Sequence, residues 1–153
     1  MFETVVIATD GSESAARAVG MALDLSDRFD AMVHAIYVVD AGELEASPED
    51  YRANLEEALE TAGGEALSFV EEQAADAGAD SDVVTAVREG DPASEIIDYA
   101  QNCDADAIAT GTRGRHGDHA FLLGSVAEAI VRRSPIPVLT VRQLGEDEQP
   151  AAH

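Results

Sequence analysis

Two groups of glycines in the last third of the chain could hold an anionic ligand. Two residues separate Gly111 from Gly114, and nine more lead to Gly124 and Ser125. Gly111 closes an expected buried strand, where the missing Cβ lets a ligand approach the backbone, and Gly114 can adopt a positive φ. Gly124 and Ser125 open an expected helix, whose free N–H groups and dipole favour an anion. This combination indicates a phosphate-binding site.

The glycines and arginines of this loop also allow other interpretations. Loops also use glycine for turn geometry alone. The spacing is neither that of the lysine-bearing phosphate loop, since the chain has no lysine, nor that of the dinucleotide fingerprint, which needs three glycines within six positions. Arg113 and Arg115 could bind phosphate or form ion pairs with surface carboxylates. We expect His116 and His119 to be ordinary loop residues.

Three further residues have side chains that could do chemistry. Asp10 follows the first apolar run, in Asp10-Gly11-Ser12. It could cap the next helix, contact a ribose hydroxyl, or help to hold a metal ion on phosphates. Cys103 is the only cysteine, so an internal disulfide is excluded, and we expect it to pack near a helix end. We expect His34 to lie on a sheet surface with its polar atoms satisfied.

Strand and helix patterns alternate along the chain and would position these residues. Apolar residues at steps of three and four predict helices between short apolar runs that predict strands. The five expected strands cover residues 5–8, 32–39, 82–87, 105–109 and 136–141. This alternation predicts a single α/β domain over residues 1–142, with an open parallel five-stranded sheet and helices on both faces. We expect residues 143–153 to form a flexible polar tail.

Local signals predict where individual helices begin and where one is interrupted. Ser47 has the character of an N-cap and Pro48 that of a first helical residue, ahead of a long helix. Gly63-Gly64 within that helix predicts a kink or a break. Asp91 before Pro92 predicts the cap of a later helix.

The charge balance restricts the possible partners. The chain has 31 acidic and nine basic residues, all nine arginine, for a formal net charge of −22. Such a surface argues against general binding to nucleic acid or to an anionic membrane. The acid excess without lysine is typical of a salt-adapted protein, although an ordinary acidic protein has a similar composition. No apolar run approaches the roughly 18 residues of a membrane span, and no secretory signal is visible, so we expect a cytoplasmic protein.

The glycine spacing resembles, without gap or mismatch, the ATP-binding motif of the universal stress protein family. Residues 5–12, 90–93 and 134–142 are also similar to family features, so the resemblance covers residues 2–142. It implies an adenine nucleotide alpha hydrolase-like fold with strand order 3-2-1-4-5 and a nucleotide bound where strands one and four part. Family members without the glycine pattern generally do not bind ATP, so the complete pattern implies the ATP-binding subgroup.

The resemblance also implies the ligand contacts. The nucleotide would be ATP, or AMP or ADP, with Mg or Mn on its phosphates. From the adenosine end to the phosphates, the implied cofactor-binding residues are Ala8, Thr9, Asp10, Val38, Thr110, Gly111, Arg113, Gly114, Gly124, Ser125 and Val126.

Three functions are compatible with these residues. The first is a nucleotide-binding stress regulator whose state a partner protein reads. The second is a slow ATPase, for which the sequence shows no general base with a fixed partner. The third is a structural interaction protein with an empty site. The resemblance further implies a homodimer in which the fifth strand pairs over Val138 to Arg142.

Overall fold

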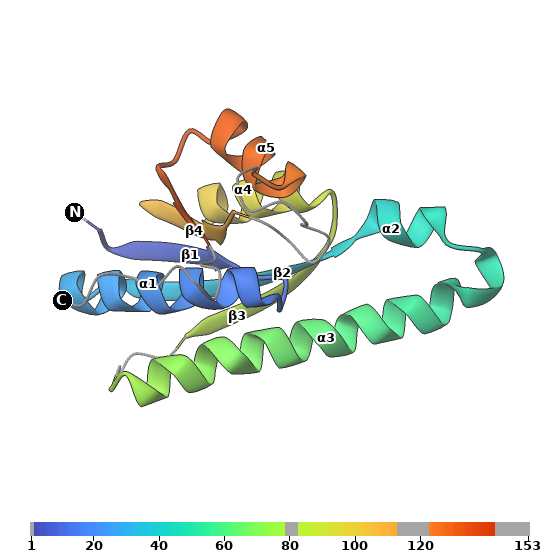
Figure 1. The fold of residues 1–153 in the computed structure, drawn as a ribbon. Helices are drawn as coiled ribbons and strands as arrows, with labels where there is room; N and C mark the ends of the chain where they lie inside the picture. Colours follow the sequence, from blue (N-terminus) through green and yellow to red (C-terminus); the bar gives the residue numbers. More distant parts are fainter. Residues whose placement is uncertain (1, 79–82, 113–122, 143–153) are drawn as a thin grey trace.

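The protein folds around one five-stranded sheet whose strands are all parallel (Figure 1). The structure, a computed structural model, describes residues 2–78, 83–112 and 123–142. The strand order β3-β2-β1-β4-β5 confirms the predicted 3-2-1-4-5. The strands are β1 (Thr4–Ala8), β2 (Met32–Asp40), β3 (Val84–Gly90), β4 (Ala107–Gly111) and β5 (Val138–Val141). The helices are α1 (Glu13–Phe29), α2 (Ala41–Ala46), α3 (Glu49–Asp76), α4 (Pro92–Asn102) and α5 (Ser125–Arg133).

Helices cover both faces of the sheet, as the sequence predicts. Successive residues of a strand point to opposite faces, so Val6 and Ile7 of β1 belong to two different core clusters. Ile7 packs with residues of α1 and α3, whereas Val6 packs with residues of α4 and α5 (Figure 1). Both clusters consist mainly of Ala, Val, Leu and Ile, and both central side chains are fully buried. This two-sided burial explains why the inner strands are almost continuously apolar.

The long helix α3 is continuous through Gly63 and Gly64, so the predicted kink or break is wrong. Gly63 is buried against β2, where a Cβ would lie 2.7 Å from Cδ1 of Tyr37. The glycine therefore allows the helix to approach a buried aromatic ring rather than interrupting the helix. Gly64 faces open space.

The short helix α2 follows β2 directly and is capped by the Asp40 side chain, which accepts from Gly42 N and Glu43 N. The predicted cap of α3 is also wrong. Ser47 ends α2, and its hydroxyl donates to the carbonyl of Glu43 at 3.0 Å, so it does not cap α3. Pro48 occupies the N-cap position without a side-chain hydrogen bond. Ser47 lies between the end of α2 and the start of α3, and its hydroxyl binds the end of α2.

Two reactive side chains on the α4 side of the sheet have structural roles, as predicted. His34 Nδ1 lies 2.8 Å from the hydroxyl of Tyr99. The guanidinium of Arg88 stacks over the Tyr99 ring in a cation–π contact. Burial lowers the pKa of His34. Cys103 packs against the core cluster beneath α4 and α5, and burial raises the pKa of its thiol. In the part of the chain that the structure describes, no helix is long and apolar enough to cross a bilayer.

Candidate functional site

The winding of the sheet reverses between β1 and β4, and this is where an open parallel sheet offers a ligand crevice. β1 pairs with β2 on one side and with β4 on the other. Ala8, the last residue of β1, is aligned with Ile36 and with Thr110. The segments that follow Ala8 and Thr110 therefore leave the sheet side by side. These are two of the segments from which the sequence predicted ligand contacts.

The β1 side of the crevice is a tight turn built by side chains. Buried Thr9 donates its N–H to the carbonyl of Ile36 at 3.1 Å, and its hydroxyl accepts from Gly11 N at 3.2 Å. Asp10 Oδ1 accepts from Ser12 N at 2.9 Å. The N-cap of α1 is Ser12, so the alternative in which Asp10 caps this helix is wrong. Asp10 instead fixes the turn at the carboxyl end of β1.

Apolar side chains from three elements gather on the α4 and α5 side of the sheet, beside the point where its winding reverses. Val38 of β2 and Val126 of α5 are half-buried and pack against the same core cluster, which also contains Ala8. Three of the predicted contact residues thus come together from three separate elements. The side chains of Ala8 and Val38 could contact an uncharged, planar part of a ligand or its sugar.

The β4 side brings the two halves of the glycine motif into direct contact. Thr110 and Gly111 are the last, buried residues of β4. The next residue, Thr112, accepts a hydrogen bond at its carbonyl from Gly124 N, at 2.6 Å. Its own N–H donates to the carbonyl of Val141 at 3.2 Å. One peptide segment thereby joins β4, β5 and the start of α5. The predicted contacts Arg113 and Gly114, together with Arg115, His116 and His119, lie outside the described residues.

The first turn of α5 has backbone N–H groups that lie outside the intrahelical hydrogen bonds. Gly124 is the N-cap and provides no side-chain hydrogen bond, while its carbonyl accepts from Glu128 N. The N–H groups of Ser125, Val126 and Ala127 precede the first intrahelical bond, so they can donate to a ligand. Arg132 and Arg133 at the other end complement the helix dipole. A phosphate group fits such a helix start.

The sequence interpretation missed Thr112 as a candidate contact. Its Oγ1 is buried and has no hydrogen-bond partner within the described ranges. A buried hydroxyl of this kind is unusual unless a ligand, ion or water satisfies it. The signal available from sequence was weak, since Thr112 occupies one of the two variable positions between Gly111 and Gly114. Among the residues that the structure describes, no group of three or more His, Cys, Asp or Glu could hold a metal ion.

The strand order and the helices on both faces define a class of protein, the doubly wound α/β fold. Residues 1–142 match the universal stress protein family. The chain is 38% identical over 144 residues to universal stress protein MJ0531 of Methanocaldococcus jannaschii, covering 94% of this chain and 84% of that protein. The chain belongs to the universal stress protein family.

Solved structures agree with this assignment. The protein MJ0577 superimposes with a TM-score of 0.84 at 25% identity, over 95% of this chain and 99% of that chain. A universal stress protein in complex with cAMP superimposes with a TM-score of 0.70 at 28% identity, over 92% and 97% of the two chains. The doubly wound architecture predicted from the sequence is therefore shared with solved members of the family.

Proposed function

We propose that this protein binds ATP or a related adenine nucleotide in the crevice between β1 and β4, as a nucleotide-dependent regulator of the stress response. The observation that carries the proposal is the hydrogen bond from Gly124 N to the carbonyl of Thr112. It brings the end of β4 beside the uncapped start of α5, so backbone donors and small residues face one location. A structure 28% identical to this chain is a complex with cAMP, which supports an adenine nucleotide as the ligand.

The two ends of the crevice suit the two ends of such a nucleotide. The half-buried side chain of Val38 would contact the base or ribose, with Thr9 and Asp10 at the adenosine end in the turn after β1. Ser125 and the free N–H groups of α5 would bind the phosphates. The predicted loop contacts Arg113 and Gly114 would follow the nucleotide between these ends.

The buried hydroxyl of Thr112 and the uncapped α5 both fit a bound phosphate group, because each lacks a partner that the ligand would supply. We infer that Mg or Mn accompanies the nucleotide on its phosphates. Asp10 supplies a carboxylate in the turn after β1 and could support such an ion. The ion would neutralise phosphate charge in a protein whose net charge is −22.

The proposal is tested by nucleotide binding measured at high potassium chloride. Nucleotide retained after purification would be identified, and ATP, ADP, AMP and GTP would be titrated by calorimetry with and without MgCl2. We expect adenine nucleotides to bind, ATP more tightly with the metal ion, and GTP to bind less tightly. Phosphate release followed over hours separates a binding protein from a slow ATPase. A folded protein that binds none of these nucleotides would contradict the proposal.

A further inference from the structure

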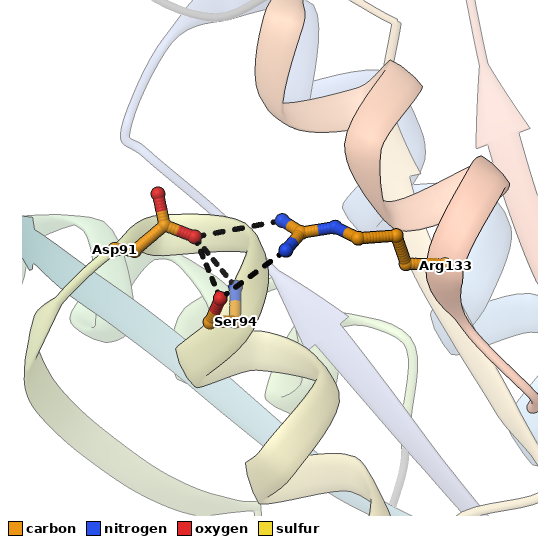
Figure 2. Close-up of polar contacts among 3 residues, drawn as sticks. All are labelled: Asp91, Ser94 and Arg133. Atoms are coloured by element: carbon orange, nitrogen blue, oxygen red, sulfur yellow. Dashed lines mark hydrogen bonds and ion pairs between the residues drawn. The ribbon is translucent and has the colours of Figure 1, made fainter.

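The C-terminal residue of α5 is tied to the N-terminus of α4. Arg133 Nη1 donates to Ser94 Oγ at 3.4 Å, and Arg133 Nη2 lies 3.5 Å from Asp91 Oδ2 (Figure 2). The same oxygen of Asp91 accepts from Ser94 N at 3.1 Å and from Ser94 Oγ at 2.8 Å. Asp91, Ser94 and Arg133, which we call the α4–α5 clamp, therefore form one connected group.

The carboxylate of the clamp stays charged at neutral pH. Hydrogen bonds from the hydroxyl and the N–H of Ser94, and the nearby Arg133 guanidinium, hold the pKa of Asp91 below its ordinary value. Asp91 is also the N-cap of α4, where the helix dipole favours a negative charge. The anchoring group for Arg133 is thus fixed by α4 itself, whether or not Arg133 is present.

Apart from this clamp, α5 is held by apolar contacts along one face. Ala127 and Ile130 are buried, and Val126 and Ala129 are half-buried against the same core cluster. In contrast, α4 buries four apolar side chains. At the start of α5, the hydrogen bond from Gly124 N to Thr112 is the anchor that the described residues show. The orientation of α5 therefore depends on its two ends as well as on a narrow apolar contact.

The geometry of a short helix amplifies a displacement at its C-terminal end. At about 1.5 Å per residue, Arg133 lies roughly 4.5 Å and Ser125 roughly 7.5 Å along the axis from Ile130, which is fully buried. If α5 tilts about Ile130, a shift of roughly 1 Å at Arg133 moves Ser125 by roughly 1.7 Å. A displacement of this size exceeds the tolerance of a phosphate-binding hydrogen bond.

We propose that Arg133 is a positioning residue for the phosphate-binding end of α5 and acts through Asp91 and Ser94. This inference rests on the proposed nucleotide function. The adjacent Arg132 supplies a matched contrast, because it carries the same charge at the same helix end but pairs with Glu128 within α5. It cannot fix α5 relative to α4.

The test compares four variants in about 1 M potassium chloride, where the Debye length of about 3 Å suppresses long-range charge effects. Arg133→Gln and Asp91→Asn each remove the ion pair of the clamp, and Asn preserves the capping of α4. Arg132→Gln is the charge-matched control, and the fourth variant combines Arg133→Gln with Asp91→Asn. For each, ATP and adenosine are titrated by calorimetry, and far-UV circular dichroism and thermal melts verify the fold.

We expect Arg133→Gln and Asp91→Asn each to weaken ATP binding by roughly 1.5- to fivefold, the range that an exposed ion pair allows. The double variant should bind ATP with about the same affinity as the single variant that has the lower affinity, because both changes remove the same interaction. Adenosine affinity should not change, whereas general destabilisation would lower both affinities. Arg132→Gln should bind ATP like the wild type.

If long-range charge alone controlled ATP affinity, Asp91→Asn would strengthen ATP binding, because it removes a negative charge. That result, or equal losses in Arg132→Gln and Arg133→Gln, would overturn the positioning role. If the wild-type protein binds ATP no better than adenosine, α5 does not bind the phosphates. The positioning role of Arg133 would then be contradicted as well. Wild-type protein that binds neither ligand would instead contradict the proposed nucleotide function.

Discussion

At the scale of single residues, backbone groups contribute more to the crevice than reactive side chains do. Thr112 uses its N–H for β5 and its carbonyl for the start of α5, so one residue determines how the two halves of the glycine motif meet. The donors offered by α5 are also backbone N–H groups. A site of this kind is suited to holding phosphate rather than to proton transfer.

A side chain at Gly124 should interfere with phosphate binding. Gly124→Val places two methyl groups beside the donors of α5, and we expect at least a tenfold loss of ATP affinity, or about 1.4 kcal/mol. Gly20→Val is a suitable control, because a Cβ at Gly20 meets no atom within 4 Å. If folded Gly124→Val binds ATP with unchanged affinity, the phosphate site does not lie at the start of α5.

A cluster of three carboxylates should produce a measurable pH dependence of stability. Partial desolvation, together with Glu56 and Glu60, raises the pKa of Glu89 above its ordinary value of 4.5. Folded Glu89 therefore binds its proton at a higher pH than unfolded Glu89, so its charged form destabilises the fold at neutral pH. We expect Glu89→Gln to raise the melting temperature at pH 7. This gain should shrink as the pH falls through the folded pKa towards 4.5.

The control for this prediction is Glu71→Gln, which removes one charge from an exposed position of α3. Melts of both variants at one salt concentration, between about pH 7 and pH 4, provide the comparison. An equal gain for both variants at every pH would show that only net charge matters. In that case the cluster around Glu89 would have no specific effect.

At the scale of elements, close packing explains features that propensity alone misreads. Gly63 and Gly64 are adjacent in α3, yet only Gly63 contacts another element. The buried ring of Tyr37 occupies the space that a side chain at Gly63 would need. The same residue type thus allows close packing at one position and has no packing role at the next.

Alanine substitutions should separate these two glycines. Gly64→Ala should stabilise the protein by up to about 1 kcal/mol, because alanine favours a helix interior over glycine. Gly63→Ala gains the same propensity but pushes its Cβ into the ring of Tyr37. We expect it to be less stable than Gly64→Ala by roughly 1–3 kcal/mol. Chemical denaturation of both variants measures the difference, and equal stabilities would mean that α3 can shift freely away from β2.

At the scale of the whole molecule, the charge of −22 should make stability depend on salt. Screening weakens repulsion among the carboxylates, with a Debye length that falls from about 10 Å at 0.1 M to about 3 Å at 1 M salt. We expect the melting temperature to rise with potassium chloride concentration over this range. A flat or falling melting temperature would remove the argument for salt adaptation.

The outer edge of β5 should join two copies of the chain. Pro137 and Val141 accept hydrogen bonds from β4, so alternation directs the backbone groups of Val138 and Thr140 away from the sheet. The next outward carbonyl, that of Arg142, accepts from Arg17 Nη1 at 2.7 Å, so the edge available for pairing centres on Val138 and Thr140. Such an edge can pair with its copy about a two-fold axis. Light scattering at high salt should give a mass of about 32 kDa, twice the 16.0 kDa of the chain.

The structure also decides which substitution tests this interface. Leu139 packs against the core beneath α1 and α3, so a charge there would destabilise the protomer itself. Thr140→Pro removes an outward N–H instead and leaves the hydrogen bonds to β4 in place. We expect this variant to be a monomer. A dimer of unchanged stability in Thr140→Pro would place the interface elsewhere.

The sequence by itself determined the class of fold, and it predicted where a ligand site would lie. Alternating apolar periods locate strands and helices because burial requires them, and they predicted the elements from β1 to β5 within a few residues. The resemblance to universal stress proteins added the strand order and the role of the segments after β1 and β4. The cap at Asp91 was also predictable, since it depends only on residues adjacent in the chain.

Only the tertiary structure decided contacts between residues distant in sequence. The role of Gly63 depends on Tyr37 of β2, and the end of α2 took the hydroxyl of Ser47. The connection of Thr112 to both Val141 and Gly124, and that of Arg133 to Asp91, join elements whose spacing in the sequence carries no signal. The physical reason is that local patterns record burial and capping along one element, whereas these contacts arise from the packing of several elements against one another.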